Sequence, residues 1–155
     1  RYRLDFSVII FDLDSFKQVN DTYGHITGDL VLKSIASICE NNLRQVDILA
    51  RYGGEEFVVL LPKIPLEGAG QVAERLRKLI AEEEIICEGG QPIHLTASFG
   101  AAALHSETNS LDEILTCADR ALLVAKQRGK NQVYLWRLGV AMGDQSFNNL
   151  PGEES

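Results

Sequence analysis

Residues 8–14 read VIIFDLD, a continuous apolar run that ends in two carboxylates. A strand without polar alternation is buried on both faces, so we expect Val8–Phe11 to lie inside a sheet. The strand should stop at Asp12, which places this carboxylate at the strand end where α/β-type sheets usually bind ligands. Asp14 or Ser15 is expected to cap the short helix that follows, to about Tyr23. Asp12 is then not needed as a helix cap, and it could have either a functional or a structural role.

A second pair of carboxylates follows a glycine turn. Strand-forming residues lie on both sides of Gly53-Gly54, and two glycines supply the positive φ that a tight hairpin turn needs. Glu55-Glu56 then put like charges at the hairpin tip, where Glu is a poor strand residue. They either form a solvated turn that discourages edge pairing or serve a site. If the hairpin lies beside the first strand, Glu55 can face Asp12, and the two carboxylates could hold Mg²⁺.

The other patterns complete a β-α-α-β-β-α-β-α-β order. Gly24 and Gly28 punctuate the chain, and alternation over 93–99 predicts a half-buried strand. Three stripes of helical spacing, over about 30–43, 72–80 and 114–125, and a last strand at 133–136 follow from the same reading. We therefore expect an α+β domain, one mixed or antiparallel sheet covered by helices, over residues 1–136. Residues 137–155 are expected to be a flexible tail.

Composition restricts the class of protein. A chain of 155 residues with 45% apolar content is one domain. The net charge of −7 argues against binding to a nucleic-acid polymer, but a metal ion and a few cations can still hold one triphosphate. Cys39 and Cys117 are expected to be buried, reduced thiols in a cytoplasmic protein. No run is long enough for a membrane span, so we expect no membrane contact, although the chain resembles a piece of a longer, sensory or membrane protein.

Four motifs in order resemble the GGDEF domain of diguanylate cyclases. They lie at 11–21, 24–29, 53–57 and 125–131, and the resemblance covers residues 6–136 without the helix and turn that usually precede this domain. It implies a nucleotidyl cyclase or palm-like fold that condenses two GTP into cyclic di-GMP with release of two pyrophosphates. The alternative is a catalytically inactive receptor of the same family that binds cyclic di-GMP or GTP. A palm-type transferase or adenylyl cyclase is a further rival.

The resemblance also implies roles for the acidic residues. Asp12, the carbonyl of Leu13 and Glu55 would be the ligands of Mg²⁺ or Mn²⁺, and Glu55 or Glu56 would deprotonate the attacking 3′-hydroxyl. The third signature position is Glu55 rather than Asp, a GGEEF variant that the family accepts. Each domain would hold one GTP, so catalysis is expected to need a homodimer.

The nucleotide is expected to contact two further groups of residues. Backbone amides of Ser15, Phe16 and Lys17, which open a helix, resemble the loop that binds the phosphates. Asn20 and Asp29 resemble the guanine readers. A carboxylate accepts from guanine N1–H and the exocyclic amine, whereas adenine offers an acceptor at N1, so adenine would leave Asp29 unpaired.

The remaining expectations concern cations. Lys126 and Lys130 resemble the residues over the terminal phosphates, and on a continuous helix they would share a face. Without the other motifs, Lys126 and Lys130 would be interpreted as solvated residues in the last turn of a helix. Lys130 also departs from the family pattern, in which Arg is common at this position. Arg44 and Asp47 match the RxxD motif that binds cyclic di-GMP as a feedback inhibitor, with Arg75 as a second cation. The alternative interpretation is that Arg44 and Asp47 form an ordinary i,i+3 ion pair with a structural role only.

Overall fold

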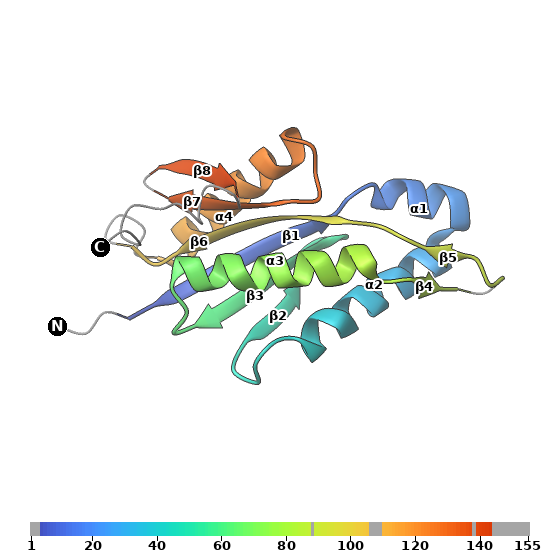
Figure 1. Ribbon diagram of the computed structural model, residues 1–155, viewed down its shortest axis with the longest axis horizontal. Coiled ribbons are helices and arrows are strands. Elements are labelled where there is room, and N and C mark those ends of the chain that lie inside the picture. Colours follow the sequence, from blue (N-terminus) through green and yellow to red (C-terminus); the bar gives the residue numbers. More distant parts are fainter. Residues whose placement is uncertain (1–3, 88, 106–109, 138, 144–155) are drawn as a thin grey trace.

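The structure, a computed structural model of the chain, describes residues 4–87, 89–105, 110–137 and 139–143. A six-stranded sheet has the order β2-β3-β1-β6-β7-β8, and β4 and β5 form a separate two-stranded sheet (Figure 1). The six-stranded sheet comprises β1 (Phe6–Leu13), β2 (Ile48–Arg51), β3 (Glu56–Pro62), β6 (Ala97–Ala103), β7 (Val133–Arg137) and β8 (Val140–Gly143). The small sheet and the helices are β4 (Ile85–Ile86), β5 (Pro92–Ile93), α1 (Phe16–Tyr23), α2 (His25–Asn41), α3 (Leu66–Glu82) and α4 (Leu111–Gln127). The expected α+β fold is confirmed.

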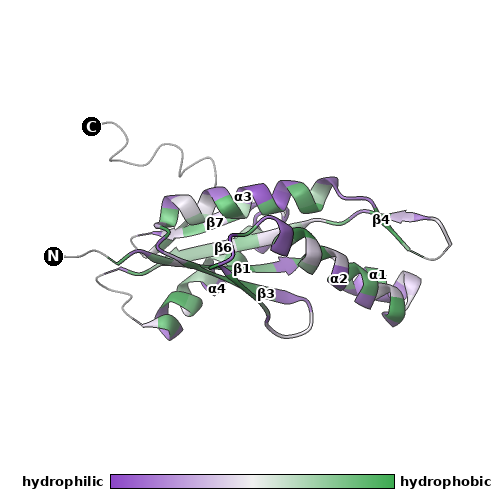
Figure 2. Cartoon of the chain, turned by 90° about the horizontal axis from the view of Figure 1, so that it is seen from below, coloured by the Kyte–Doolittle hydropathy of each residue, from purple (hydrophilic) through white to green (hydrophobic). Residues whose placement is uncertain are grey.

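Strand β1 lies at the centre of the sheet and is buried on both faces. It pairs antiparallel with β3 and with β6, whereas β6 and β7 are parallel, so the sheet is mixed. Ile9 and Phe11 pack in the core that includes α2 and α3, while Val8 and Ile10 pack in the core that includes α4. In Figure 2 the hydrophobic strands lie between α3 and α4. The continuous apolar run is thus explained by helices on both sides.

Close packing holds the α4 face in place. A Cβ on Gly100 in β6 would lie 2.1 Å from the carbonyl oxygen of Ala118 in α4, so only glycine lets this helix approach the strand. On the other face the Phe11 ring stacks between Phe57 and Phe99, with centroids 4.9 and 4.7 Å away. These contacts fix β1, and with it the residues at its carboxyl end.

The structure corrects several expected boundaries. Strand β1 continues through Leu13, because Asp12 still pairs with residues of β3 and β6 on either side. Helix α2 begins at His25, so Gly28 lies inside it rather than before it. The alternation over 93–99 was misleading: β5 ends at Ile93, and β6 begins at Ala97 and is buried on both faces.

Two further findings concern the cysteines and the end of the chain. Cys39 and Cys117 are buried and free, as predicted, and burial raises the pKa of Cys39 to about 12. The expected flexible tail is wrong at Val140–Gly143, which forms β8 against β7. Residues 144–155 lie outside the described residues. None of the helices in the described part of the chain has both the length and the hydrophobicity that crossing a membrane requires.

Candidate active site

An acidic cluster lies at the carboxyl end of β1. Asp12 pairs across the sheet with Glu56 in β3 and with Ser98 in β6. Its side chain is 14% exposed, and Oδ2 accepts a hydrogen bond of 2.6 Å from Nζ of Lys126 in α4. Oδ1 is buried and has no hydrogen-bond partner in the described part of the chain. Because a buried carboxylate oxygen without a partner is unfavourable, Asp12 offers one oxygen to a ligand.

The glycine hairpin brings both glutamates to this cluster. Only Gly53 of the two glycines has a positive φ, +83°, and four residues separate the strands, so the turn is wider than the expected two-residue one. The register makes Glu56 the direct partner of Asp12, whereas the carbonyl of Glu55 accepts from the amide of Leu13 at 3.4 Å. The structure therefore places Glu55 beside Leu13 and Glu56 opposite Asp12.

Burial and mutual repulsion perturb both glutamates. Partial burial raises the pKa of Glu55, and the charge of Asp12 raises it further, while Lys126 opposes the shift. Burial also raises the pKa of Glu56, with Asp119 of α4 and then Asp12 adding to the rise. Sequence reasoning missed Asp119, which carried no motif. The negative charges of these carboxylates repel one another, and a bound divalent cation would relieve that repulsion.

The residues present fit a hard divalent cation. Asp12 Oδ1 is unpaired among the described residues, and the charge of Asp12 acts on the carboxylate of Glu55, whose backbone lies beside Leu13. Oxygen donors of this kind are the ones that Mg²⁺ and Mn²⁺ prefer. Among the described residues no three His, Cys, Asp or Glu side chains are grouped to hold a metal.

The start of α1 leaves its first amides without a side-chain cap. Ser15 occupies the N-cap position with φ 60°, yet its side chain makes no cap hydrogen bond, and no acidic residue lies in the first turn. Asp14 is not a cap either, because its carboxylate is buried against β6. Phe16 is buried, whereas Ser15 and Lys17 are exposed. Uncapped amides at a helix start favour an anion.

The junction of α1 and α2 brings Asn20 and Asp29 near each other. A Cβ on Gly28 would lie 1.9 Å from Asn20 Oδ1, so the side chain of Asn20 packs directly on this glycine. Asp29 is the next residue and is exposed. Gly28 was read as punctuation, but it creates the space that Asn20 occupies. A polar amide and a carboxylate thus lie on adjacent helices, α1 and α2.

Lys126 and Lys130 do not share a helix face. Helix α4 ends at Gln127, and Lys130 and Asn131 adopt left-handed conformations with φ of 63° and 49°. The amide of Lys130 donates to the carbonyl of Ala125 at 3.0 Å, which closes the turn after the helix. Lys126 therefore reaches the cluster from α4, whereas Lys130 belongs to a separate turn.

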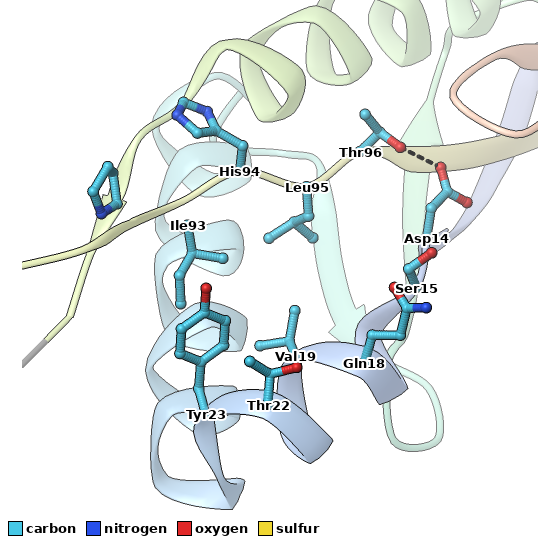
Figure 3. A pocket seen from close by; sticks show the side chains of 11 residues that line it. Asp14, Ser15, Gln18, Val19, Thr22, Tyr23, Ile93, His94, Leu95 and Thr96 are labelled. Atoms are coloured by element: carbon cyan, nitrogen blue, oxygen red, sulfur yellow. Dashed lines mark hydrogen bonds between the residues drawn. The ribbon is translucent and has the colours of Figure 1, made fainter.

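An open cleft of about 420 Å³ lies along another face of α1 (Figure 3). Its walls are α1 and the segment from Pro92 to Thr96. Hydroxyl groups of Thr22, Tyr23 and Thr96 line it beside apolar side chains, and Ser15 joins it to the start of α1. No motif in the sequence indicated this cleft, since the segment was predicted to be a strand.

Arg44 and Asp47 lie apart from the acidic cluster, in the loop between α2 and β2. The guanidinium of Arg44 binds the carboxylate of Asp47 at 2.6 Å and the carbonyl of Pro62 at 2.8 Å. Asp47 raises the pKa of Arg44, which is largely exposed. Arg75 of α3 donates to the carbonyl of Asn42 at 2.8 Å, so a second cation reaches the same loop.

Comparisons with known proteins agree with these features. The family described as "Diguanylate cyclase, GGDEF domain" matches residues 1–132. Diguanylate cyclase A of Treponema denticola is 41% identical over 145 residues, which are 94% of this chain and 36% of that protein. Diguanylate cyclase DgcP of Pseudomonas aeruginosa is 44% identical over 83% of this chain and 19% of its own length. The chain thus spans a minor part of these relatives.

Two solved structures share the fold. The active GGEEF domain of a diguanylate cyclase from Vibrio cholerae is similar with a TM-score of 0.80 and 32% identity, over 86% of this chain and 83% of that one. The GGDEF domain of DgcB from Caulobacter crescentus, in complex with c-di-GMP, has a TM-score of 0.80 and 29% identity, over 85% of this chain and 78% of its own.

Proposed function

This chain belongs to the GGDEF diguanylate cyclase family, and from that premise we propose that it condenses two GTP molecules into cyclic di-GMP with release of two pyrophosphates. The observation that carries the proposal is the buried, unpaired Oδ1 of Asp12 within an acidic cluster. A domain that had lost catalysis would have no need to retain this unfavourable arrangement. The intact carboxylates therefore favour the enzyme over the receptor.

The acidic cluster would hold the metal. Asp12, the carbonyl of Leu13 and Glu55 are the proposed ligands of Mg²⁺ or Mn²⁺. Lys126 occupies only Oδ2 of Asp12, so Oδ1 remains available for the ion. The bound cation supplies charge neutralisation at the phosphates and lowers the pKa of a nearby hydroxyl.

The chain's own residues would bind and orient the nucleotide. The uncapped amides of Ser15, Phe16 and Lys17 would bind the phosphates, assisted by Lys126 and Lys130. On the other side, Asn20 and Asp29 would read the guanine edge. Because Asp29 can only accept hydrogen bonds, it pairs with guanine N1–H and discriminates against adenine.

Either glutamate could accept the proton of the attacking 3′-hydroxyl. The raised pKa of Glu55 and of Glu56 brings both carboxylates nearer to a working pH, which suits a general base. Because Glu55 is also a proposed metal ligand, Glu56 is the better candidate to accept the proton. The hydroxyl of one GTP then attacks the α-phosphorus of the other, and pyrophosphate leaves.

Two copies of the domain must face each other during this reaction. One set of guanine and phosphate groups binds one GTP, so the second substrate has to come from a second copy, and we propose a two-fold homodimer. Inhibition by the product is proposed at Arg44 and Asp47 of the loop between α2 and β2, together with Arg75, which reaches this loop from α3. The cyclic di-GMP complex of the Caulobacter domain supports binding of this ligand within the family.

The test of the function is direct. The purified domain is incubated with GTP and Mg²⁺, and the nucleotides are separated by chromatography. Cyclic di-GMP and pyrophosphate in a 1:2 ratio are expected, and ATP in place of GTP should give no cyclic product. Tight binding of cyclic di-GMP without turnover would instead identify the receptor, and an excess of linear product would contradict the two-fold geometry.

A further inference from the structure

Asp14 is a buried carboxylate to which none of the functions above assigns a role. It is 5% exposed, and four hydrogen bonds among the described residues join it to two other parts of the chain. Its amide donates to the carbonyl of Thr96 at 2.8 Å, and the Thr96 hydroxyl donates back to Oδ2 at 2.7 Å. The hydroxyl of Ser98 donates to Oδ1 at 2.7 Å. Figure 3 shows Asp14 and Thr96 facing each other at the end of the cleft.

The fourth hydrogen bond connects Asp14 to the turn that carries Lys130. The amide of Asn131 donates to Oδ2 of Asp14 at 3.0 Å, and it also lies 3.2 Å from the hydroxyl of Ser98. Asn131 and Lys130 are consecutive residues in the left-handed conformation. Asn tolerates this conformation, but for Lys130 it is unfavourable, so contacts from outside help the turn to persist.

The side chain of Asn131 is held as well. Its Oδ1 accepts a hydrogen bond of 2.8 Å from Nη1 of Arg77 in α3, and Arg77 is itself paired with Glu74 one turn earlier. Asn131 is therefore fixed at its amide by Asp14 and at its side chain by α3. Because Asp14 directly precedes Ser15, one carboxylate joins the start of α1 to the Lys130 turn.

We propose that Asp14 is a positioning residue that sets the distance between the two phosphate-binding segments, the amides at the start of α1 and the Lys130 turn. The inference rests on the proposed function, since it takes a nucleoside triphosphate as the ligand of both segments. Asp14 does not contact phosphate itself, because its negative charge would repel the phosphate and because all described partners of its carboxylate are donors within the protein. Its effect is confined to the phosphate end of the nucleotide.

This confinement makes the proposal testable by comparing GTP with GMP. Both nucleotides present the same base to Asn20 and Asp29, but only GTP spans the two phosphate-binding segments. The variants are Thr96→Val and Ser98→Ala, which each remove one hydroxyl donor to Asp14 without touching a proposed ligand. Thr116→Val is the matched control, since it removes a hydroxyl hydrogen bond from the outer surface of α4. Thr96→Ser restores the donor and should rescue.

Calorimetry would measure the dissociation constants of GMP and of a GTP analogue that cannot release pyrophosphate. In the double variant Thr96→Val/Ser98→Ala we expect the analogue to bind about tenfold more weakly, the scale of one charge-assisted hydrogen bond, and GMP to change less than about twofold. In the free protein the amides of residues 128–131 should exchange hydrogen faster in the double variant than in wild type. Thr116→Val and Thr96→Ser should match wild type in both measurements.

The possible results separate this inference from the proposed function. Equal losses for GMP and the analogue would show that Asp14 merely supports the fold and would overturn the inference. An unchanged preference for the triphosphate, or a wild-type protein without any such preference, would overturn it too. If wild type makes no cyclic di-GMP but the variants lose the triphosphate preference, the proposed synthesis fails while the positioning role stands.

Discussion

Replacing Asp12 with alanine should abolish synthesis and leave the fold almost equally stable. The change removes the 2.6 Å hydrogen bond from Lys126, a charge-assisted contact worth about 1.5–3 kcal/mol. It also removes the buried, unpaired Oδ1, whose burial costs about 1–3 kcal/mol. These two effects oppose each other, and repulsion of Glu55 and Glu56 is relieved as well. We therefore expect the free energy of unfolding to change by no more than about 1 kcal/mol.

Binding should respond very differently. A GTP analogue with Mg²⁺, supplied at about 100 times its dissociation constant, should stabilise the wild-type domain by about 2.7 kcal/mol. The Asp12→Ala variant should lose most of this gain, because the metal loses a ligand. Denaturant unfolding with and without the analogue and Mg²⁺, followed by chromatography of the reaction products, measures both effects. Glu82→Ala, which removes an exposed carboxylate at the end of α3, is the control and should behave as wild type.

Three results would refute this reasoning. If the variant still makes product at the wild-type rate, Asp12 is not a metal ligand. If it keeps the full stabilisation by the analogue and Mg²⁺, the acidic cluster does not bind the ion. If unfolding becomes easier by more than about 3 kcal/mol, Asp12 is an ordinary structural residue whose ion pair with Lys126 outweighs the unpaired oxygen.

Three further predictions concern pH, guanine and product. The pKa values of Glu55 and Glu56 are raised in the folded protein, so the folded state binds protons at these groups more readily than the unfolded state does. The metal-free domain should therefore lose stability as the pH rises through these raised values. Denaturant titrations at several pH values measure this dependence, and the double variant Glu55→Gln/Glu56→Gln should flatten it. Gly28→Ala should push the Asn20 side chain away and weaken GTP binding by about tenfold in calorimetry, with little loss of stability because a side-chain end can move. Arg44→Ala should leave the initial rate unchanged and raise the concentration of cyclic di-GMP needed for half inhibition by about tenfold or more in rate assays.

Each of these has a contradicting outcome. A pH dependence that survives in the double glutamine variant would assign the effect to other groups. Equal GTP affinity of Gly28→Ala and wild type would separate Asn20 from guanine recognition, and a large loss of stability would make Gly28 a packing residue only. An unchanged inhibition curve for Arg44→Ala would leave Arg44 and Asp47 as the ordinary ion pair that the structure shows, and Lys78→Ala on the exposed side of α3 is the control.

Local patterns in the sequence predicted the elements that depend on neighbours along the chain. The apolar run of β1, the helical stripes of α2 to α4 and the glycine hairpin were all recovered, since burial period and turn chemistry are local properties. The same reading failed at β6 and β8. The alternation before Phe99 does not form one strand, because residues 94–96 belong to neither β5 nor β6, and β8 is a short strand that pairs with the edge that β7 offers.

The order of the motifs was enough to predict the family and to name the candidate residues. It could not place them, because placement depends on strand register and on contacts between distant segments. The direct partner of Asp12 is Glu56, and Lys126 arrives from a helix 114 residues later. Lys130 lies beyond the end of α4, so the continuous helix on which Lys126 and Lys130 would share a face does not form.

Asp14 illustrates the division most clearly. Its sequence neighbours, Ser15 and the start of a helix, indicate a cap, and nothing nearby suggests otherwise. Its side-chain partners are 82, 84 and 117 residues away, and they meet only after β6 and the end of α4 have packed beside β1. Amino-acid order alone thus specified which chemical groups the site contains, through local periodicity and motif spacing. Folding decided which of these groups keep an oxygen free, as Asp12 does, and which are fully hydrogen-bonded, as Asp14 is, because hydrogen bonds across a sheet join residues that the chain itself keeps far apart.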